Sequence, residues 1–293
     1  MSEICSLTRE AFRFLKPVDV SIQSVIQAHC GKNYLSYLMY FDTAISDYWR
    51  ALALPYEATF AALQGDLYVK KATVEFHASA RVDDQLDVAL KCHRIGTSSI
   101  VFTGAIFRGE EYLISCELIY VFADPATQTS RPVPASLRDI LLGYEAGQVM
   151  QDIAVGDWQT LAEGARLVRR EVFVQEQRIP IEMEQDDADA DAVHVLISNR
   201  LGLPVATGRL LQPAPGVGQI GRLAVNRVLR GSHLGRAALQ ALMTAAAHRG
   251  DREIMLHAQS SAQGFYAVQG FVPRGEPFVE AGIAHIEMVC ALN

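Results

Sequence analysis

Four stretches of alternating apolar and polar residues follow one another between residues 65 and 124, and they limit most how this chain can fold. In the clearest one, EEYLISCELIYVFAD, an apolar residue recurs at every second position from Tyr112 to Phe122. That spacing places the apolar side chains on one face of an extended strand. Short breaks such as ARVDD, GTS and GEE separate the stretches and favour antiparallel neighbours. The pattern predicts antiparallel strands at 65–78, 84–96, 98–109 and 110–124.

A long helix is expected immediately before these strands. In NYLSYLMYFDTAISDYWRAL, residues 33–52, apolar side chains recur at spacings of three and four, and Asn33 is available as the N-cap. Because little of this stretch is strongly polar, the helix is expected to be covered on most sides. A buried helix wrapped by a long antiparallel sheet satisfies both patterns.

The second half of the chain has a different texture. The stretch 125–150 contains three prolines, a short helical pattern and a boundary near 146–150. Helices and strands then alternate, with helices expected at 158–175 and 233–249, strands near 193–198, 203–211 and 218–226, and then the strand EIMLHA, a short helix through GFYAVQG and the strand HIEMVCAL. We predict an α+β protein with two domains, residues 1–148 and 149–293.

Composition excludes several classes of function. The chain has 293 residues, half of them hydrophobic, and a net charge of −7, which disfavours non-specific nucleic-acid binding. No apolar run approaches the roughly 20 residues that span a bilayer. The N-terminus lacks the pattern of a signal peptide. The five cysteines are scattered and form no CxxC, so we expect reduced thiols in a cytoplasmic protein.

No metal site is expected either. The acidic segment DDADADAVH, residues 186–194, lacks the glycine and the terminal glutamate of a calcium-binding EF-hand loop. It is expected to be a solvated loop.

The segment LRGSHLGRAALQALM, residues 229–243, combines glycines with the start of a helix. A helix N-terminus presents unpaired N–H groups and the positive end of the helix dipole, and glycines let a ligand approach the backbone. Such a turn suits a pyrophosphate, although it is neither a P-loop nor a GxGxxG motif. A simple tight turn with a helix cap is the alternative.

The flanking motifs resemble the GNAT acetyltransferases, in particular the ElaA-like branch. They are RREVFVQEQRIP, EQDDAD, AVHVL, ATGRLL, IGRLAV, AQSSAQGFY and GIAHIEM, in family order over residues 155–293. The resemblance implies that acetyl-CoA or another acyl-CoA binds through main-chain groups of Leu223, Ala224 and Val225. Its pyrophosphate would bind the turn formed by Arg230, Gly231, Ser232, His233, Leu234, Gly235 and Arg236. His233 departs from the family pattern, which has glycine at that position.

The same resemblance assigns candidate catalytic residues for acetyl transfer to a small amine. Tyr266 matches the position of the acid that protonates the leaving thiolate; the alternative is an aromatic that packs the helix onto the sheet. Glu176 is the sequence-matched base, with a surface or capping role as the alternative. His194 and His285 also match the family, but histidines flanked by apolar residues are more often structural.

The N-terminal half resembles the hotdog-fold acyl-CoA thioesterases of the 4-hydroxybenzoyl-CoA type. The resemblance rests on YLMYFDTA, on the strand run 74–124 and on RPVPASLRDIL, and it covers residues 8–146. The acidic residue that such enzymes carry before the helix is missing, and Gln27, His29 and Asn33 are the polar groups present. Gln27 and His29 are therefore the candidate catalytic residues. A hotdog that only binds acyl-CoA or dimerises is the alternative, and a homodimer is implied by the resemblance.

The sequence thus predicts a two-domain protein that uses acyl-CoA. The GNAT half would acylate a small-molecule amine, and the hotdog half would hydrolyse or bind an acyl thioester, on coenzyme A or on an acyl carrier protein. Three alternatives remain open. Only one half is catalytic, both halves form a scaffold, or the hotdog presents longer acyl chains to the transferase.

Overall fold

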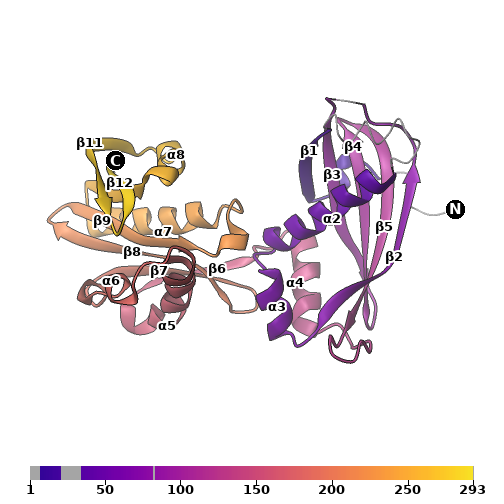
Figure 1. The fold of residues 1–293 in the computed structure, drawn as a ribbon, viewed down its shortest axis with the longest axis horizontal. Coiled ribbons are helices and arrows are strands. Elements are labelled where there is room, and N and C mark those ends of the chain that lie inside the picture. The colour runs from indigo at the N-terminus through magenta and orange to yellow at the C-terminus, as the bar shows by residue number, and fades with distance from the viewer. Residues whose placement is uncertain (1–6, 21–33, 82, 293) are drawn as a thin grey trace. The chain divides into compact units, whose positions relative to one another are not determined.

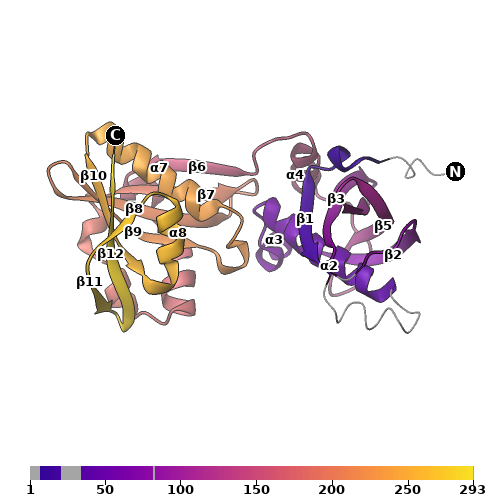
Figure 2. The ribbon, with the colours of Figure 1, turned by 90° about the horizontal axis from the view of Figure 1, so that it is seen from above.

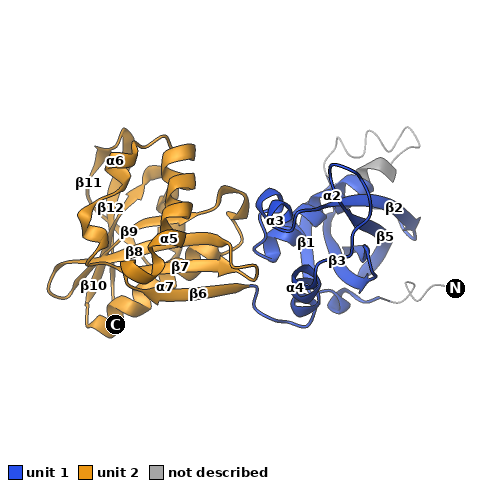
Figure 3. Cartoon of the chain, turned by 90° about the horizontal axis from the view of Figure 1, so that it is seen from below, with its two compact units in different colours: residues 1–150 blue, residues 151–293 orange. Residues whose placement is uncertain are grey.

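The computed structural model describes residues 7–20, 34–81 and 83–292. The chain divides into two compact units, residues 1–150 and 151–293 (Figure 3). In the described ranges, no helix is both long enough and apolar enough to cross a membrane.

The first unit contains a five-stranded antiparallel sheet in the order β1-β3-β4-β5-β2. Its strands are β1 (Phe14–Asp19), β2 (Asp66–Phe76), β3 (Gln85–Ile95), β4 (Ser99–Arg108) and β5 (Glu111–Ala123), and its helices are α2 (Tyr34–Ala51), α3 (Tyr56–Ala62) and α4 (Ala135–Glu145). The four strands expected between residues 65 and 124 are confirmed, each end lying within two residues of its prediction.

Helix α2 lies along one face of this sheet, as Figures 1 and 2 show. Phe41 and Tyr48 on the sheet-facing side are fully buried, but the opposite side is exposed at Met39, Thr43 and Arg50, so the expected covering on most sides is wrong for the described chain. Gly104 of β4 makes room for the Phe41 ring, because a Cβ at that glycine would lie 2.6 Å from Phe41 Cε1. The Tyr48 hydroxyl donates a hydrogen bond of 2.6 Å to Glu145 Oε1, so α2 is also tied to α4.

The second unit contains a seven-stranded sheet in the order β11-β12-β10-β9-β8-β7-β6. Its strands are β6 (Gln151–Gly156), β7 (Val193–Asn199), β8 (Pro204–Ala214), β9 (Val217–Val225), β10 (Glu253–Gln259), β11 (Val272–Glu280) and β12 (Ile283–Ala291), and its α-helices are α5 (Trp158–Arg169), α6 (Ile181–Glu184), α7 (Leu234–Arg249) and α8 (Gln263–Val268). The β9–β10 pair is parallel, whereas the other neighbours in the sheet are antiparallel.

Helices α5 and α7 cover opposite faces of this sheet (Figure 1). The helix expected at 158–175 is confirmed in extent but changes type near its end, because α5 ends at Arg169 and a π-helical segment, η3 (Arg170–Glu176), continues from it. The wider turns of a π-helix change which side chains share a face. Here they keep Val172 and Phe173 in one apolar cluster with Val168 of α5 and Ala224 of β9.

Candidate active site

The parallel pairing of β9 with β10 stops halfway along the two strands. Its last pair joins Ile220 to Leu256. Beyond that pair, an irregularity in the β8–β9 register coincides with Arg222, whose φ of +50° is unusual for a residue other than glycine. The two strands then separate. In the described chain, no strand pairs on the β10 side with the main-chain groups of Leu223, Ala224 and Val225.

The turn that joins β9 to α7 presents backbone N–H groups without acceptors. The amides of Ser232 and Arg230 donate to carbonyls within the turn. In contrast, no described carbonyl or side chain accepts from the amides of Gly231, His233, Leu234, Gly235 and Arg236. Gly231 and His233 are exposed, with φ values of +86° and +66°. A row of free amides at the start of a helix is the arrangement that binds an anion.

One side chain of this turn already has a partner. The two terminal guanidinium nitrogens of Arg230, Nη1 and Nη2, bond to the carboxylate of Glu176, at 2.7 and 2.6 Å. The pair connects the end of η3 to the turn before α7. Glu176 is therefore held beside the predicted phosphate site.

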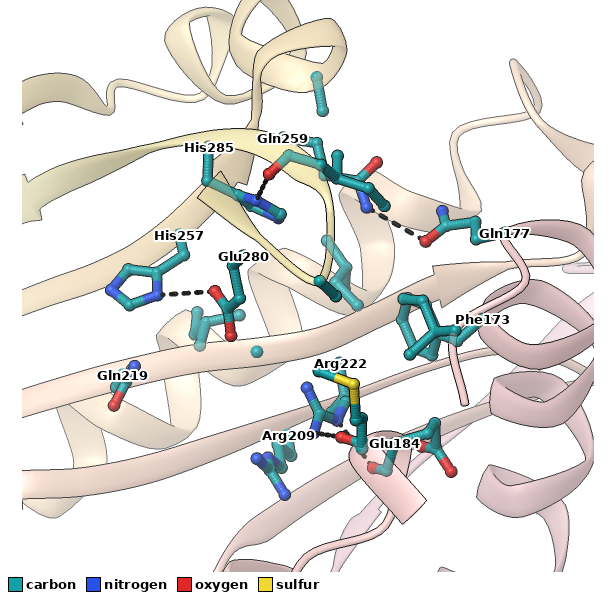
Figure 4. A pocket seen from close by; sticks show the side chains of 18 of the residues that line it. Phe173, Gln177, Glu184, Arg209, Gln219, Arg222, His257, Gln259, Glu280 and His285 are labelled. Atoms are coloured by element: carbon teal, nitrogen blue, oxygen red, sulfur yellow. Dashed lines mark hydrogen bonds and ion pairs between the residues drawn. The ribbon is translucent and has the colours of Figure 1, made fainter. Parts of the chain in front are cut away.

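A cavity of about 300 Å³ lies on the sheet face that η3 and α6 cover, at the point where β9 and β10 separate (Figure 4). Phe173, Ile179 and Met183 line one side, and strands β8 to β12 and helix α8 supply most of the rest. Tyr266 of α8 is in the lining. Burial raises the pKa of Tyr266 to about 12, so its hydroxyl keeps its proton at neutral pH.

At one end of the cavity, three arginines and three carboxylates form a charged cluster. Arg169 is 1% exposed and bonds to the carboxylate of Glu184 and, at 2.8 Å, to Asp189 Oδ1. Arg209 reaches the same Asp189 oxygen at 2.8 Å and forms a two-point ion pair with Asp186. We name the six residues the arginine cluster: Arg169, Glu184, Asp186, Asp189, Arg209 and Arg222.

The acidic segment 186–194 is therefore not the solvated loop expected from its composition. Asp189 is buried, and hydrogen bonds from Arg209 hold the pKa of Asp186 below its ordinary value. The expectation failed because the arginines that neutralise these carboxylates lie 20 to 36 residues away in the sequence, as the pairs Asp189–Arg169 and Asp186–Arg222 illustrate. Buried carboxylates require such partners.

Opposite the arginine cluster, the cavity is lined by two histidines and a glutamate (Figure 4). His257 Nδ1 lies 3.4 Å from Glu280 Oε2. His285 Nδ1 donates a hydrogen bond of 2.8 Å to the carbonyl oxygen of Ile283, which leaves Nε2 as the ring nitrogen with a free lone pair. The cavity thus has Arg209 and Arg222 at one end and Glu280 with two histidines at the other.

The structure brings together some of the residues singled out from the sequence. Leu223, Tyr266 and His285 line the cavity, and the 230–236 turn follows the open end of β9. Glu176 is absent from the described lining, although its neighbour Gln177 is in it and accepts a hydrogen bond of 3.1 Å from Gln259. His194 is buried elsewhere, with Nε2 2.9 Å from the Asp189 carbonyl oxygen.

Two candidates lie outside the described residues, namely Gln27 and His29. Where the structure describes them, the cysteines are free thiols: Cys92, Cys116 and Cys290. Within the described ranges, no group of three His, Cys, Asp or Glu side chains is placed to hold a metal ion.

Sequence reasoning missed Arg209, Arg222, His257 and Glu280. The two arginines had a visible signal, since each interrupts an otherwise apolar strand, in ATGRLL and in IGRLAV. A charge inside a buried strand requires a partner or a ligand. Glu280 had no comparable signal, because it sits at the end of an exposed strand.

Comparison with known proteins now defines the class. An acetyltransferase (GNAT) domain model matches residues 160–292, and a thioesterase superfamily model matches residues 36–115. The chain belongs to the GNAT acetyltransferases through its C-terminal unit, and a thioesterase-like hotdog domain precedes that unit.

Two relatives and one solved structure illustrate the two parts. The chain is 35% identical to the uncharacterized N-acetyltransferase YjcF of Bacillus subtilis over 42% of this chain and 86% of YjcF. It is 36% identical to protein ElaA of Escherichia coli over 41% of this chain and 81% of ElaA. The first unit is similar to the crystal structure of Slr0204, a 1,4-dihydroxy-2-naphthoyl-CoA thioesterase from Synechocystis. That match covers 44% of this chain and 95% of Slr0204, with 14% identity and a TM-score of 0.39.

Proposed function

We propose that the C-terminal unit transfers an acetyl or other acyl group from coenzyme A to a small-molecule amine in the cavity beside Tyr266. The observation that carries the proposal is the open end of β9, where unpaired strand groups lead to the free amides of the 231–236 turn. The strand edge suits the amide groups of a pantetheine arm, and the turn suits its pyrophosphate. Leu223 at the open strand edge lines the cavity, which is large enough for a small acceptor.

The proposed reaction divides its protons between two groups. The amine nitrogen attacks the thioester carbonyl carbon, a C–N bond forms, and the C–S bond breaks. Backbone N–H groups of β9 stabilise the oxygen as it gains charge. The departing thiolate takes the Tyr266 proton, and the surplus proton of the amine goes to a base. The products are an amide and the free thiol.

Two groups are candidates for that base. Glu176 is the one the family motif assigns, but both of its carboxylate oxygens bond to Arg230, and it is absent from the described lining of the cavity. His257 lines the cavity, and its Nδ1 lies 3.4 Å from Glu280 Oε2. We favour His257 as the acceptor of the proton. Measuring the pH dependence of the amine-dependent rate after replacing each residue separately distinguishes the two. The variant that has lost the base should fall furthest below the wild-type rate at low pH.

For the N-terminal unit we propose binding or hydrolysis of an acyl thioester, on coenzyme A or on an acyl carrier protein. Its thioesterase-family match supports a thioester ligand, and hotdog sheets support a homodimer by analogy. The alternative is that one half alone is catalytic and the other binds acyl-CoA or dimerises. We further propose that function divides between residues 1–148 and 149–293.

Thiol release from a panel of acyl-CoAs, measured on the full chain with and without amines, tests these proposals. Amine-dependent release is expected and supports transfer. Release without amine supports hydrolysis by the first unit. No thiol release either with or without amines contradicts catalysis and favours a binding or scaffolding role.

A further inference from the structure

Arg222 is the member of the arginine cluster with the weakest neutralisation. Arg169 has the carboxylates of Glu184 and Asp189, and Arg209 has those of Asp186 and Asp189. Arg222 reaches a single carboxylate oxygen, Asp186 Oδ2 at 3.1 Å, and Arg209 Nη2 already bonds to that oxygen at 2.7 Å.

The remaining bonds of Arg222 go to neutral groups. Its Nε and Nη2 donate to the main-chain oxygens of Glu184 and Met183, at 3.1 and 3.0 Å. Its Nη1 donates to no described residue, although the side chain is only 25% exposed and lines the cavity. Burial, followed by repulsion from Arg209, lowers the pKa of Arg222. One donor of a partly buried cation is therefore available to an anion in the cavity.

The backbone at Arg222 points to the same conclusion. Its φ of +50° places a non-glycine residue in the left-handed region, at the irregularity where β9 leaves β10. Such strain costs of order 1 kcal/mol and tends to occur at functional sites. Because the strained residue lines the cavity, its position is a feature of the acceptor site.

The other end of the cavity suits a cation. Glu280 is half exposed, and its carboxylate lies 3.4 Å from His257 Nδ1. Figure 4 shows these two side chains together on one side of the cavity, and Arg222, Arg209 and Glu184 together on the other. A carboxylate with this histidine attracts an ammonium group and can take its proton.

We propose that the acceptor is a small amine that also carries a carboxylate, as an amino acid does. Arg222 Nη1 binds the carboxylate, and Glu280 with His257 receives the amine. This inference rests on the proposed transferase function and names its substrate class. A phosphate fits less well, because a dianion would lie close to the carboxylates of Glu184 and Asp186. The cavity of about 300 Å³ limits the acceptor to a small molecule.

The test compares acceptors that differ only at the carboxylate. Amine-dependent thiol release from acetyl-CoA is measured with the full chain on alanine, alaninamide and ethylamine, and on the matching sets for phenylalanine and lysine. Rates are compared per unprotonated amine. We expect kcat/KM to be about 10- to 100-fold higher for the acids, the range of one hydrogen bond to a charged group.

Arg222→Gln is expected to bring that ratio close to one. Arg222→Lys keeps a charge without the guanidinium fork and retains part of the ratio; it also provides a second measurement if the glutamine variant does not fold. Arg200→Gln is the matched control, because Arg200 pairs with an exposed Asp152 at 3.2 Å, and the ratio should stay at the wild-type value.

Each result decides the question. A wild-type chain that acylates alaninamide and ethylamine as well as alanine overturns the substrate class and leaves the transferase proposal intact. A preference for the acid that survives both Arg222 variants also overturns it. If no member of any set is acylated while acetyl-CoA binds, the transferase proposal fails, and this inference fails with it.

Discussion

The two units solve the burial of polar groups in different ways. In the first unit the sheet is paired along its length, and its inner face carries the apolar side of α2. A single carboxylate, Glu145, links helix to helix and to the sheet, accepting from Tyr48 and from the amide of Cys92 at 2.8 Å. In the second unit the sheet opens between β9 and β10, and charged groups hold the residues around the opening.

The difference indicates what an open sheet requires. Strands that separate lose hydrogen bonds and apolar contacts, so other interactions must hold their neighbours in place. The arginine cluster does this by tying α5 and α6 to β8 and β9. A buried ion pair contributes little net stability but is costly to break. The stability of the second unit should therefore depend more on each buried charge. The stability of the first unit should depend more on the size of each buried side chain.

The largest effect is expected from Arg169→Met. It leaves Glu184 and Asp189 buried with fewer partners, and removing one member of a buried pair costs about 3–5 kcal/mol. Urea unfolding gives the cost, and hydrogen exchange on peptides of each unit locates it in residues 151–293. Arg166→Met on the same helix is the control; Arg166 is exposed over Trp158 and should cost about 1 kcal/mol or less. Equal losses in the two variants would contradict a supporting role for the cluster.

Tyr266→Phe tests the chemistry of the open unit. Loss of a general acid should lower the amine-dependent rate about 100-fold or more. With a pKa of about 12, the Tyr266 phenol stays protonated, so its titration should cause no fall in wild-type activity between about pH 7 and 10.

The matched control for this substitution lies in the first unit. Tyr56→Phe removes a hydroxyl that donates to Asp66 at 2.7 Å and should leave the amine-dependent rate unchanged. Any release without amine should be the same in wild type and Tyr266→Phe. A Tyr266→Phe rate within twofold of the wild type would remove this residue from the mechanism.

Gly104→Ala applies the opposite test to the closed unit. The added methyl group would lie 2.6 Å from the Phe41 ring, and overpacking of this kind costs about 1–3 kcal/mol. The free energy of unfolding is expected to recover in part when Phe41→Leu is added. Gly264→Ala in α8 is the control, since no described atom lies within 4 Å of its Cβ position. If both alanine variants are equally stable, the helix is not packed as closely as the structure has it.

Sequence reasoning succeeded where the pattern is local. The four long strands of the first unit and helix α7 follow from period-two and helical spacing, and the turn before α7 follows from glycines at a helix start. It missed β1, β6 and β11, which occupy sheet edges; β1 and β11 contain Pro17 and Pro273. Proline interrupts the alternating pattern of a strand, and an edge strand pairs on one side only, so its sequence pattern is weaker.

The cavity was harder to predict than the fold. The end with His257 and Glu280 joins β10 to β11. The end with the arginine cluster joins β8, β9 and the segment after η3. These groups meet through pairing between distant strands, which residue spacing does not encode. Tyr266 and Leu223 were found through the family motifs, whereas Arg222 and His257 required the three-dimensional arrangement.

The smallest effect is expected at His233, where this chain departs from the family's glycine. A φ of +66° disfavours a side chain, although histidine tolerates it better than most residues. His233→Gly should therefore change stability by only about 0.5 kcal/mol, because glycine also gains entropy when unfolded. Removing the side chain lets a phosphate approach the free amides, so acetyl-CoA should bind a few-fold more tightly in a calorimetric titration of the full chain.

Gly231→Ala gives the converse measurement in the same turn. With φ at +86°, an alanine there strains the backbone and should weaken acetyl-CoA binding. Tighter binding by His233→Gly with weaker binding by Gly231→Ala would show that the shape of the main chain determines the affinity. If His233→Gly instead binds acetyl-CoA more weakly, the imidazole itself contacts the ligand, and the substitution in this chain adds a contact where the family relies on backbone alone.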